Sequence, residues 1–423
     1  MTGPGPERAT IGRTPLGRLF VAQVVTSLGD GAVLTTATLY FAVIVGFGEQ
    51  LVGLALAGGA LAGLLLSVPI GILGDRIGLA RAAAGLSGVS AVAMVLFAVA
   101  STPPTYVVGA VLFGVAQASL APMRQAIAAS QLPLEARVRM RALLHTLHNI
   151  GFGAGAAAGA VAVALQQHAV FVGVFVTVAG ICIITGVGYL TLHGSTTAAI
   201  STLPGAESRV WRNPRLLALT GLSAVLQFAM PVLSVLLPIW VATRTSAPEW
   251  LAAAALAMNT VIVVAVQLRW ATFVSTAGRA RVSALIAGGA ALLACVVLGT
   301  ASGLDAASAT VATIVGVLLI TVTEVCAGAA AWFQLTRLSP MGRQGEFQSV
   351  YATSTTFARI LGAGVLLPVV MAAGLLAWGV LGAVIAAAGV LLAVALGRGV
   401  DPSADAGPAA RTGVVPEPDG PAA

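Results

Sequence analysis

Three ionisable residues lie deep inside long apolar runs of the 423-residue chain: Asp30, Glu324 and Arg359. A charged side chain at the centre of a bilayer costs at least about 2.5–3.5 kcal/mol on insertion scales, so a residue of this kind indicates a functional site. A carboxylate placed there can bind and release a proton, because desolvation penalises its charged form. We therefore predict that Asp30, Glu324 and Arg359 take part in proton coupling or substrate binding.

Plainer interpretations of these residues stay open. Asp30 can form only a hydrogen bond between helices, as polar residues in membranes often do. Glu324 and Arg359 can form a buried ion pair in which Arg359 is a structural counter-charge. His145 and His148 fall at the start of a predicted span, where an interfacial position is the simpler interpretation and a proton relay the alternative. The amides that are candidates to line a cavity are Gln117, Gln227, Asn259 and Gln334.

Composition requires that these residues lie in membrane helices. The chain is 58% hydrophobic and 8% charged, with a mean hydropathy of +0.99, whereas soluble domains carry about 25% charged residues. Only helices and closed barrels satisfy their backbone hydrogen bonds in lipid. The apolar runs are continuous rather than alternating, so we predict an all-α membrane protein.

The apolar runs are separated by short polar turns, such as the one at residues 101–104. A membrane-spanning helix needs about 20 apolar residues, and the chain has twelve such runs. The predicted spans are Leu19–Val45, Leu51–Ile72, Ala82–Ala100, Tyr106–Ala126, Ala142–Leu165, Val170–Leu192, Leu216–Val241, Leu251–Phe273, Val282–Ala301, Ala309–Phe333, Phe347–Ala373 and Leu375–Leu396.

The arginines predict the orientation. All 21 basic residues are arginine, and the cytoplasmic loops of membrane proteins are rich in basic residues. The predicted topology leaves Arg244 outside and Arg359 within a span. The arginines assigned to the cytoplasmic side are Arg8, Arg13, Arg18, Arg76, Arg81, Arg124, Arg137, Arg139, Arg141, Arg209, Arg212, Arg215, Arg269, Arg279, Arg281, Arg337, Arg343, Arg398 and Arg411. Both termini are therefore predicted to be cytoplasmic.

The turn between the second and third spans reads Gly71-Ile72-Leu73-Gly74-Asp75-Arg76-Ile77-Gly78-Leu79-Ala80-Arg81. Glycines let such a turn be tight. Asp75 can accept backbone N–H groups at the start of the following helix and favours its positive end. Arg76 and Arg81 are expected to hold the turn in the cytoplasm.

This turn resembles the loop between helices 2 and 3 of the major facilitator superfamily of transporters. Its members carry Gly-x-Leu-x-Asp-Arg-x-Gly followed by two basic residues, and the positions that match are Gly71, Leu73, Asp75, Arg76 and Gly78. Leu79 and Ala80 replace the two basic residues, and Arg81 follows one place late. The resemblance implies that Asp75 contacts the start of the eleventh span, near Gly345–Phe347, and helps to close the cytoplasmic side. A generic basic hairpin is the alternative.

Two further strings resemble parts of the same superfamily. Gly151, Gly155 and Gly159 resemble its antiporter motif, Gly-x-x-x-Gly-Pro-x-x-Gly-Gly, with Ala156 in place of the proline and Ala160 in place of the last glycine. This resemblance suggests export, while ordinary small-residue packing between helices is the alternative.

The second string, Ser27-x-Gly29-Asp30, resembles the drug- and macrolide-efflux branch. It lies near the middle of the first predicted span and contains the carboxylate that we single out above.

The resemblance implies twelve helices in two pseudo-symmetric six-helix bundles. The predicted parts are a cytoplasmic N-terminal segment, the N-terminal half, a cytoplasmic linker, the C-terminal half and a disordered cytoplasmic tail. Their boundaries are residues 1–18, 19–192, 193–213, 214–396 and 397–423.

The predicted function is proton-coupled antiport that exports small amphipathic or hydrophobic compounds, such as drugs or secondary metabolites. The expected partners are the substrate, the proton and the lipid bilayer. Nucleic acid is not expected, because the arginines are dispersed in short loops. We expect a monomer in a bacterial plasma membrane that uses no cofactor or metal. The cysteines, Cys182, Cys295 and Cys326, have no metal-ligand spacing and are expected to pack in apolar runs.

Other functions remain alternatives. The first is proton-coupled import of a small metabolite. A membrane-embedded enzyme is less well supported: Gly85-Leu86-Ser87-Gly88 matches the Gly-x-Ser-Gly of rhomboid proteases, but we expect no histidine in the middle of another span to activate the serine. We therefore predict a protein that is not an enzyme.

Overall fold

The computed structural model of the protein describes residues 15–192, 210–248, 250–340 and 342–397, and the described residues are helical with short connections. The helices of the first half are α1 (Pro15–Leu39), η2 (Tyr40–Ile44), α2 (Glu49–Ile77), α3 (Leu79–Val99), α4 (Pro103–Ser130), α5 (Leu134–Leu165) and α6 (His168–Leu190). Outside the described residues lie most of the predicted N-terminal segment, nearly all of the predicted linker and nearly all of the predicted tail.

The second half contains more interrupted helices. They are η3 (Val210–Arg212), α7 (Pro214–Leu226), α8 (Ala229–Pro231), η4 (Val232–Leu236), α9 (Leu237–Arg244), α10 (Trp250–Phe273), α11 (Ala277–Thr300), η5 (Ala301–Gly303), α12 (Ala306–Leu338), α13 (Gln344–Leu361), η6 (Gly362–Leu366) and α14 (Leu367–Gly397). The segments α7 to α9 form one membrane crossing, Pro214–Arg244. Its π-helical turn, η4, directly follows Pro231, which removes a backbone donor from the helix.

The described residues contain eleven helical segments that are long and apolar enough to cross a membrane. The last of them, Gln344–Gly397, has 54 residues and would be about 80 Å long if it were straight, far more than the bilayer core of about 30 Å. Gly374 breaks it with a φ of 53° and a ψ of −129°, which divides it into two crossings. The predicted fold of twelve transmembrane helices is thereby confirmed.

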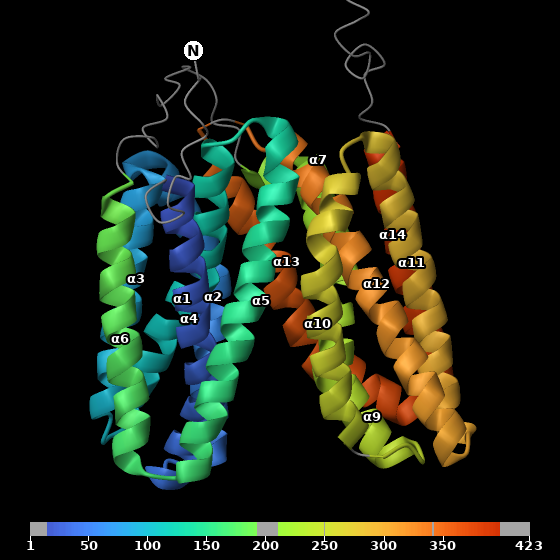
Figure 1. The fold of residues 1–423 in the computed structure, drawn as a ribbon, viewed down its shortest axis with the longest axis horizontal. Coiled ribbons are helices and arrows are strands. Elements are labelled where there is room, and N and C mark those ends of the chain that lie inside the picture. Colours follow the sequence, from blue (N-terminus) through green and yellow to red (C-terminus); the bar gives the residue numbers. More distant parts are fainter. Residues whose placement is uncertain (1–14, 193–209, 249, 341, 398–423) are drawn as a thin grey trace, which may run out of the picture.

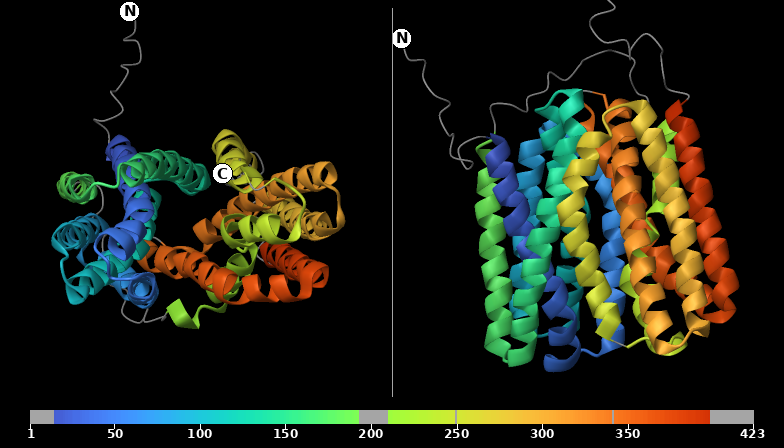
Figure 2. Two further views of the ribbon diagram at one scale, coloured as in Figure 1. Left: turned by 90° about the horizontal axis from the view of Figure 1, so that it is seen from below. Right: turned by 45° about the vertical axis from the view of Figure 1, so that its right-hand side comes forward.

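The helices form two groups, α1 to α6 and α7 to α14 (Figure 2, left). We call the end of the molecule where α2 ends and α3 begins the basic end, because it carries Arg76, Arg81, Arg139, Arg215 and Arg337. Figure 1 shows the two halves close together at this end and diverging toward the opposite one. Contacts between the halves join α2 and α4 to α13, and α5 to α10 and α12.

Helix ends in the second half are capped by short polar side chains. The Asn213 side chain accepts hydrogen bonds from the first backbone N–H groups of α7, and Thr276 does so for α11. Asp305 caps α12 at the opposite end of the molecule, and hydrogen bonds from Ser308 hold the pKa of its carboxyl group below the usual range.

Several helices extend beyond the predicted spans at the basic end. Helix α4 continues to Ser130 and α5 begins at Leu134, so the charged segment that we expected to be a loop, from Glu135 to Arg141, is the first part of α5. Arg124 was expected at the inner end of its span, but it lies within α4 and is only 2% exposed. Arg124 is therefore buried inside the first half.

Single cysteines can test whether the basic end is cytoplasmic. Thr102, Ser246 and Gly303 are exposed at the opposite end, so cysteines there should react with a membrane-impermeant maleimide in intact cells. A cysteine in place of Ile77, which is exposed at the basic end, should react only after permeabilisation. The native cysteines are buried, which keeps background labelling low. Reaction of Ile77→Cys in intact cells would reverse the orientation.

Candidate functional site

The three ionisable residues singled out from the sequence lie on three different helices. Asp30 is in α1, Glu324 in α12 and Arg359 in α13. Asp30 belongs to the first half and the other two to the second, so they define two candidate sites. Helix α5 lies next to both, because it contacts α1 on one side and α10 and α12 on the other.

A small cavity inside the first half contains Asp30. Its volume is about 50 Å³, enough for a few water molecules. Gln117 on α4 lines the cavity together with Asp30. The polar residues that line the cavity are Thr26, Asp30, Ser90, Gln117, Arg124 and His148.

Arg124 is the cationic partner of this cavity, and the sequence reasoning missed it. Its guanidinium donates a hydrogen bond to Thr26 Oγ1 at 3.2 Å, and its charge interacts with that of Asp30. Arg124 Nε is buried and has no hydrogen-bond partner. A prediction that the helix continues beyond Pro122 would have placed Arg124 inside the first half.

The glycine run of α5 brings α1 close to it. A Cβ atom on Gly155 would overlap the Leu28 carbonyl group, and one on Gly151 would lie 2.5 Å from the Val24 carbonyl oxygen. A Cβ on Gly159 would lie 2.9 Å from Thr35 Cβ. These glycines therefore let α1 pack closely against α5, in agreement with the alternative of ordinary small-residue packing between helices. A role of these glycines in antiport stays a prediction.

This close packing joins His148 to α1. His148 Nδ1 and Ser27 Oγ form a hydrogen bond of 2.8 Å, and Gln23 Nε2 donates to the same Ser27 oxygen at 2.9 Å. His148 also lines the Asp30 cavity. Ser27 thus serves as a hydrogen-bonding link between α5 and the helix that carries Asp30.

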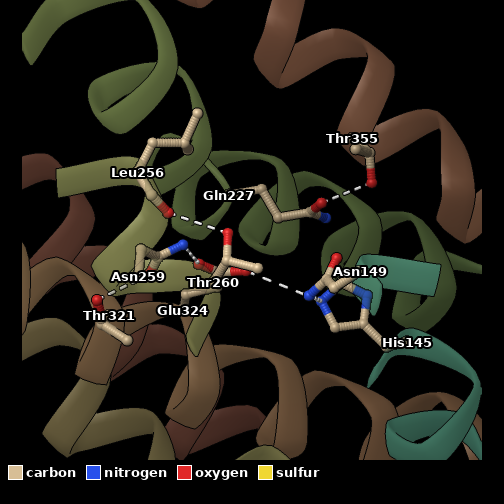
Figure 3. A network of polar contacts seen from close by, with 9 residues as sticks. All are labelled: His145, Asn149, Gln227, Leu256, Asn259, Thr260, Thr321, Glu324 and Thr355. Carbon is tan, nitrogen blue, oxygen red and sulfur yellow. Dashed lines mark hydrogen bonds and ion pairs between the residues drawn. The ribbon is translucent and has the colours of Figure 1, made fainter. Parts of the chain in front are cut away.

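Glu324 stands in a second polar network, at the boundary of the two halves (Figure 3). Its Oε2 accepts a hydrogen bond from Asn259 Nδ2 at 3.2 Å, and Asn259 Oδ1 accepts one from Thr321 Oγ1 at 2.7 Å. Its Oε1 lies 3.8 Å from His145 Nε2 on α5. Glu324 is thus held through Oε2 by Asn259 of its own half, while Oε1 faces His145 of the first half.

A buried pair between Glu324 and Arg359 was an alternative, and the structure instead pairs Glu324 with Asn259 and His145. Arg359 is exposed, and it lies near enough to His148 for their charges to interact. It therefore faces α5 from the second half.

His145 and His148 were expected at the start of the fifth span, at residue 142, whereas the helix that carries them begins earlier. Helix α5 begins at Leu134, so both histidines lie well inside it. Their spacing of three residues places them on neighbouring parts of one helix surface. His148 forms a hydrogen bond with Ser27 of α1, in the first half, and His145 approaches Glu324 of α12, in the second half.

Asp75 connects the halves at the basic end. Its two carboxylate oxygens accept hydrogen bonds from the backbone N–H groups of Gly345 and Glu346, each at 2.8 Å. These are early residues of α13. Its N-cap residue is Arg343, whose guanidinium has no atom that can accept a hydrogen bond from them. Asp75 therefore caps α13, as the resemblance implied, and not α3, as the local sequence suggested.

Glycines make this contact possible. A Cβ atom on Gly345 would lie 2.6 Å from the Gly71 carbonyl oxygen and 3.0 Å from Asp75 Oδ1. Gly71 is equally confined, because its Cβ would lie 2.6 Å from the Gly345 carbonyl oxygen. Gly78, with a φ of 100°, separates α2 from α3. The matched residues Leu73 and Arg76 are exposed, and the Arg81 side chain donates to the Ile77 carbonyl oxygen.

Arg141 makes a second contact between the halves, which the sequence reasoning did not find. It hydrogen-bonds to Gln348 Oε1. Its guanidinium lies 4.9 Å from the ring centroid of Tyr351 and 5.7 Å from that of Trp332, within the range of cation–π attraction. We call the contacts of Asp75 and Arg141 with α12 and α13 the basic-end gate.

No group of three or more His, Cys, Asp and Glu side chains in the described residues is arranged to hold a metal ion. The arrangement instead provides two carboxylates, each near a histidine of α5, and a gate of charged groups beside them. Twelve membrane helices in two halves that meet around such groups are the architecture of a membrane transporter.

The chain belongs to the Major Facilitator Superfamily, whose model matches residues 19–363. No curated protein matches the sequence.

Solved structures share the fold. A bacterial homologue of the iron transporter ferroportin in an outward-facing state is 18% identical, with a TM-score of 0.71 over 91% of this chain and 99% of that chain. The E. coli fucose:proton symporter is 14% identical, with a TM-score of 0.71 over 90% and 98%. A proton:xylose symporter is 14% identical, with a TM-score of 0.63 over 91% and 96%.

The basic-end gate predicts the effect of two substitutions. Asp75→Asn removes the charge that caps α13, which should weaken the closed gate by about 0.3–2 kcal/mol and shift a near-balanced equilibrium severalfold. Gly345→Ala should open the gate further, because its Cβ would press on Gly71. A cysteine in place of Ser349, which is buried beside Gly71, should be alkylated faster in both variants.

Gly278→Ala is the matched control, because a Cβ on Gly278 would have nothing within 4 Å. It should leave the alkylation rate at position 349 unchanged. Unaltered rates in Asp75→Asn and Gly345→Ala would show that the turn is only a hairpin.

Proposed function

We propose that the protein is a proton-coupled antiporter that exports small amphipathic or hydrophobic compounds from the cytoplasm, with drugs and secondary metabolites as the substrate class. It acts as a monomer in the plasma membrane of a bacterium. The observation that carries this proposal is the placement of Asp30 in a small cavity within a membrane helix bundle, beside a buried arginine and a histidine.

The distribution of arginine supports the orientation. The basic end faces the cytoplasm by the positive-inside rule, and both termini then lie there. The halves meet at this end and diverge toward the other (Figure 1). In this orientation the divergent end faces the outside, which supports release of a substrate from the cell.

Opposing effects on Asp30 support a role in proton coupling. Burial penalises its charged form, while the positive charge of Arg124 in the same cavity favours that form. A conformational change that alters water access to the cavity therefore alters the balance. Proton entry from outside would neutralise Asp30 and permit return to the inward-facing state, and release inside would restore its charge.

The sparse charge of the chain supports this substrate class. Only 8% of residues are charged, and binding sites for small molecules are lined mainly by apolar side chains. The fucose and xylose neighbours are described as proton symporters, which supports the proton as the coupling ion. Export is supported by the strings Ser27-x-Gly29-Asp30 and Gly151-x-x-x-Gly155-x-x-x-Gly159.

Substitution of Asp30 tests the proposal in liposomes that contain the purified protein and an imposed pH gradient. Asp30→Asn should remain folded but lose gradient-driven efflux across a panel of compounds, because it cannot exchange a proton. Asp30→Glu should retain part of the efflux with a shifted pH optimum. Glu135→Gln is the matched control, since Glu135 is an exposed carboxylate at the start of α5, and it should transport normally.

Normal pumping by Asp30→Asn would place the proton site elsewhere. Glu324 is the rival carrier, and the same assay on Glu324→Gln tests it. Uptake of a compound together with protons would reverse the proposed direction and make the protein an importer.

A further inference from the structure

The cavity that contains Asp30 is too small for the proposed substrates. Its volume is about 50 Å³, whereas pockets for drug-sized molecules measure about 300–1,000 Å³. A cavity needs only about 10–15 Å³ to hold one water molecule. This cavity can therefore hold a few water molecules or one small ion, and an exported compound does not fit inside it.

The lining of the cavity carries one carboxyl group, that of Asp30, and one guanidinium, that of Arg124. Within the part of the chain that the structure describes, neither residue is in a salt bridge, so neither charge is neutralised by direct contact. Arg124 is only 2% exposed. A buried charge is costly unless another charge compensates it, so the charge of Arg124 depends on what the cavity contains.

The hydrogen bonds of Arg124 leave one donor over. Its Nη1 donates to Thr26 Oγ1 at 3.2 Å, and the Thr26 hydroxyl group donates in turn to the Ala22 carbonyl oxygen. Thr26 is thus a neutral partner that is already engaged. Arg124 Nε is buried and has no hydrogen-bond partner in the protein. A buried N–H group of this kind needs an acceptor.

His148 adds a second donor, because Ser27 fixes its tautomer. Ser27 is fully buried, and its oxygen accepts a hydrogen bond from Gln23 Nε2 at 2.9 Å. The hydroxyl hydrogen of Ser27 then finds its acceptor in His148 Nδ1, at 2.8 Å, since a buried hydroxyl group without a partner is costly. A neutral His148 therefore carries its hydrogen on Nε2, and this ring lines the cavity.

The titratable groups near Asp30 come from the helices that pack around α1. Helix α4 contributes Arg124 to the lining of the cavity, α5 contributes His148 and α6 contributes Cys182. Tyr189 of α6 is close enough to interact with the charges of Arg124 and Asp30. The charged residues of α2 and α3 lie near the ends of those helices. Asp30 is therefore the carboxylic acid among these groups that can compensate Arg124.

We propose that this cavity binds a chloride ion when Asp30 is protonated. An ionised Asp30 compensates the charge of Arg124, and this compensation is lost when Asp30 takes up a proton. A chloride ion, only moderately larger than a water molecule, restores it and accepts hydrogen bonds from Arg124 Nε and His148 Nε2. The cavity is then electrically balanced in both protonation states.

Chloride thereby favours the protonated form of Asp30, and protonation of Asp30 favours chloride binding by the same factor. The inference rests on the proposed role of Asp30 in proton exchange, and it adds chloride as a regulator of that same site.

Two measurements on the purified full chain in detergent test this linkage without any transport. Broadening of the chloride resonance in nuclear magnetic resonance reports chloride binding, and the pH of a weakly buffered solution reports proton uptake when chloride is added. The wild-type protein should bind chloride more tightly as the pH falls. Because coupling between two ligands is reciprocal, it should take up as much as about one proton for each chloride bound.

Substitutions of the two charged residues separate the two events. Arg124→Gln should weaken chloride binding about tenfold or more, because it removes the cationic partner of a buried charge. Arg124→Lys keeps the charge and should retain part of the binding, and it serves if Arg124→Gln does not fold. Asp30→Asn resembles the protonated form, so it should bind chloride at every pH without proton uptake.

Arg139→Gln is the matched arginine control, since Arg139 is exposed near the start of α5, and it should match wild type. Bromide, a halide of similar size, should compete with chloride, whereas the larger gluconate ion should not.

Chloride binding that Arg124→Gln leaves unchanged would overturn the inference, because chloride would then bind elsewhere. Proton uptake that persists in Asp30→Asn would also overturn it, as would an absence of binding at low pH, which would mean that the cavity holds water alone. A chain that links chloride to proton uptake but pumps no compound would contradict antiport alone. One that pumps without binding chloride would contradict this inference alone.

Discussion

The first backbone N–H groups of α13 need acceptors, and Asp75 provides them from the opposite half. A helix leaves its first N–H groups without partners inside itself, and the N-cap residue here, Arg343, has no acceptor to offer. Asp75 accepts from Gly345 and Glu346, at a place where Gly71 and Gly345 let the two backbones approach. This contact closes the basic end. The stacking of Arg141 and the approach of His145 to Glu324 lie farther along the same interface and depend on the same close approach of the halves.

Helix α5 links this closed end to the candidate chemistry. Its glycines pack it tightly against α1, so His148 reaches Ser27 and the cavity that contains Asp30. Its other surface faces the second half, where Arg141 contacts the gate and His145 approaches Glu324. A movement of one half relative to the other therefore changes the surroundings of Glu324 directly, while α1 and Asp30 move together with α5. We propose proton exchange at Asp30, which lies inside the first half, whereas Glu324 lies at the boundary between the halves.

Much of the fold followed from local sequence, because apolar runs and arginine-rich turns identify membrane helices without any tertiary information. The contact of Asp75 with α13 followed from the resemblance of its turn, although local capping rules had pointed to α3. The contacts between individual charged side chains could not be predicted from the sequence. Arg124 was placed at the inner end of a span because hydropathy falls near Pro122, whereas α4 continues to Ser130. Glu324 was matched with Arg359 as the charge available in the spans, but the approach of α5 to α12 brings His145 to it instead, and that approach is a property of how the halves pack.

Distances between spin labels on the two halves test most directly whether the Asp75 cap holds the basic end closed. One label pair replaces Ile77 and Arg279 at the basic end, and the other replaces Thr102 and Ser246 at the opposite end; all four residues are exposed. In the wild-type background, double electron–electron resonance should give a short distance for the first pair and a long one for the second. Asp75→Asn should add a population in which the first distance is longer and the second shorter. Identical distance distributions with and without Asp75 would contradict the account.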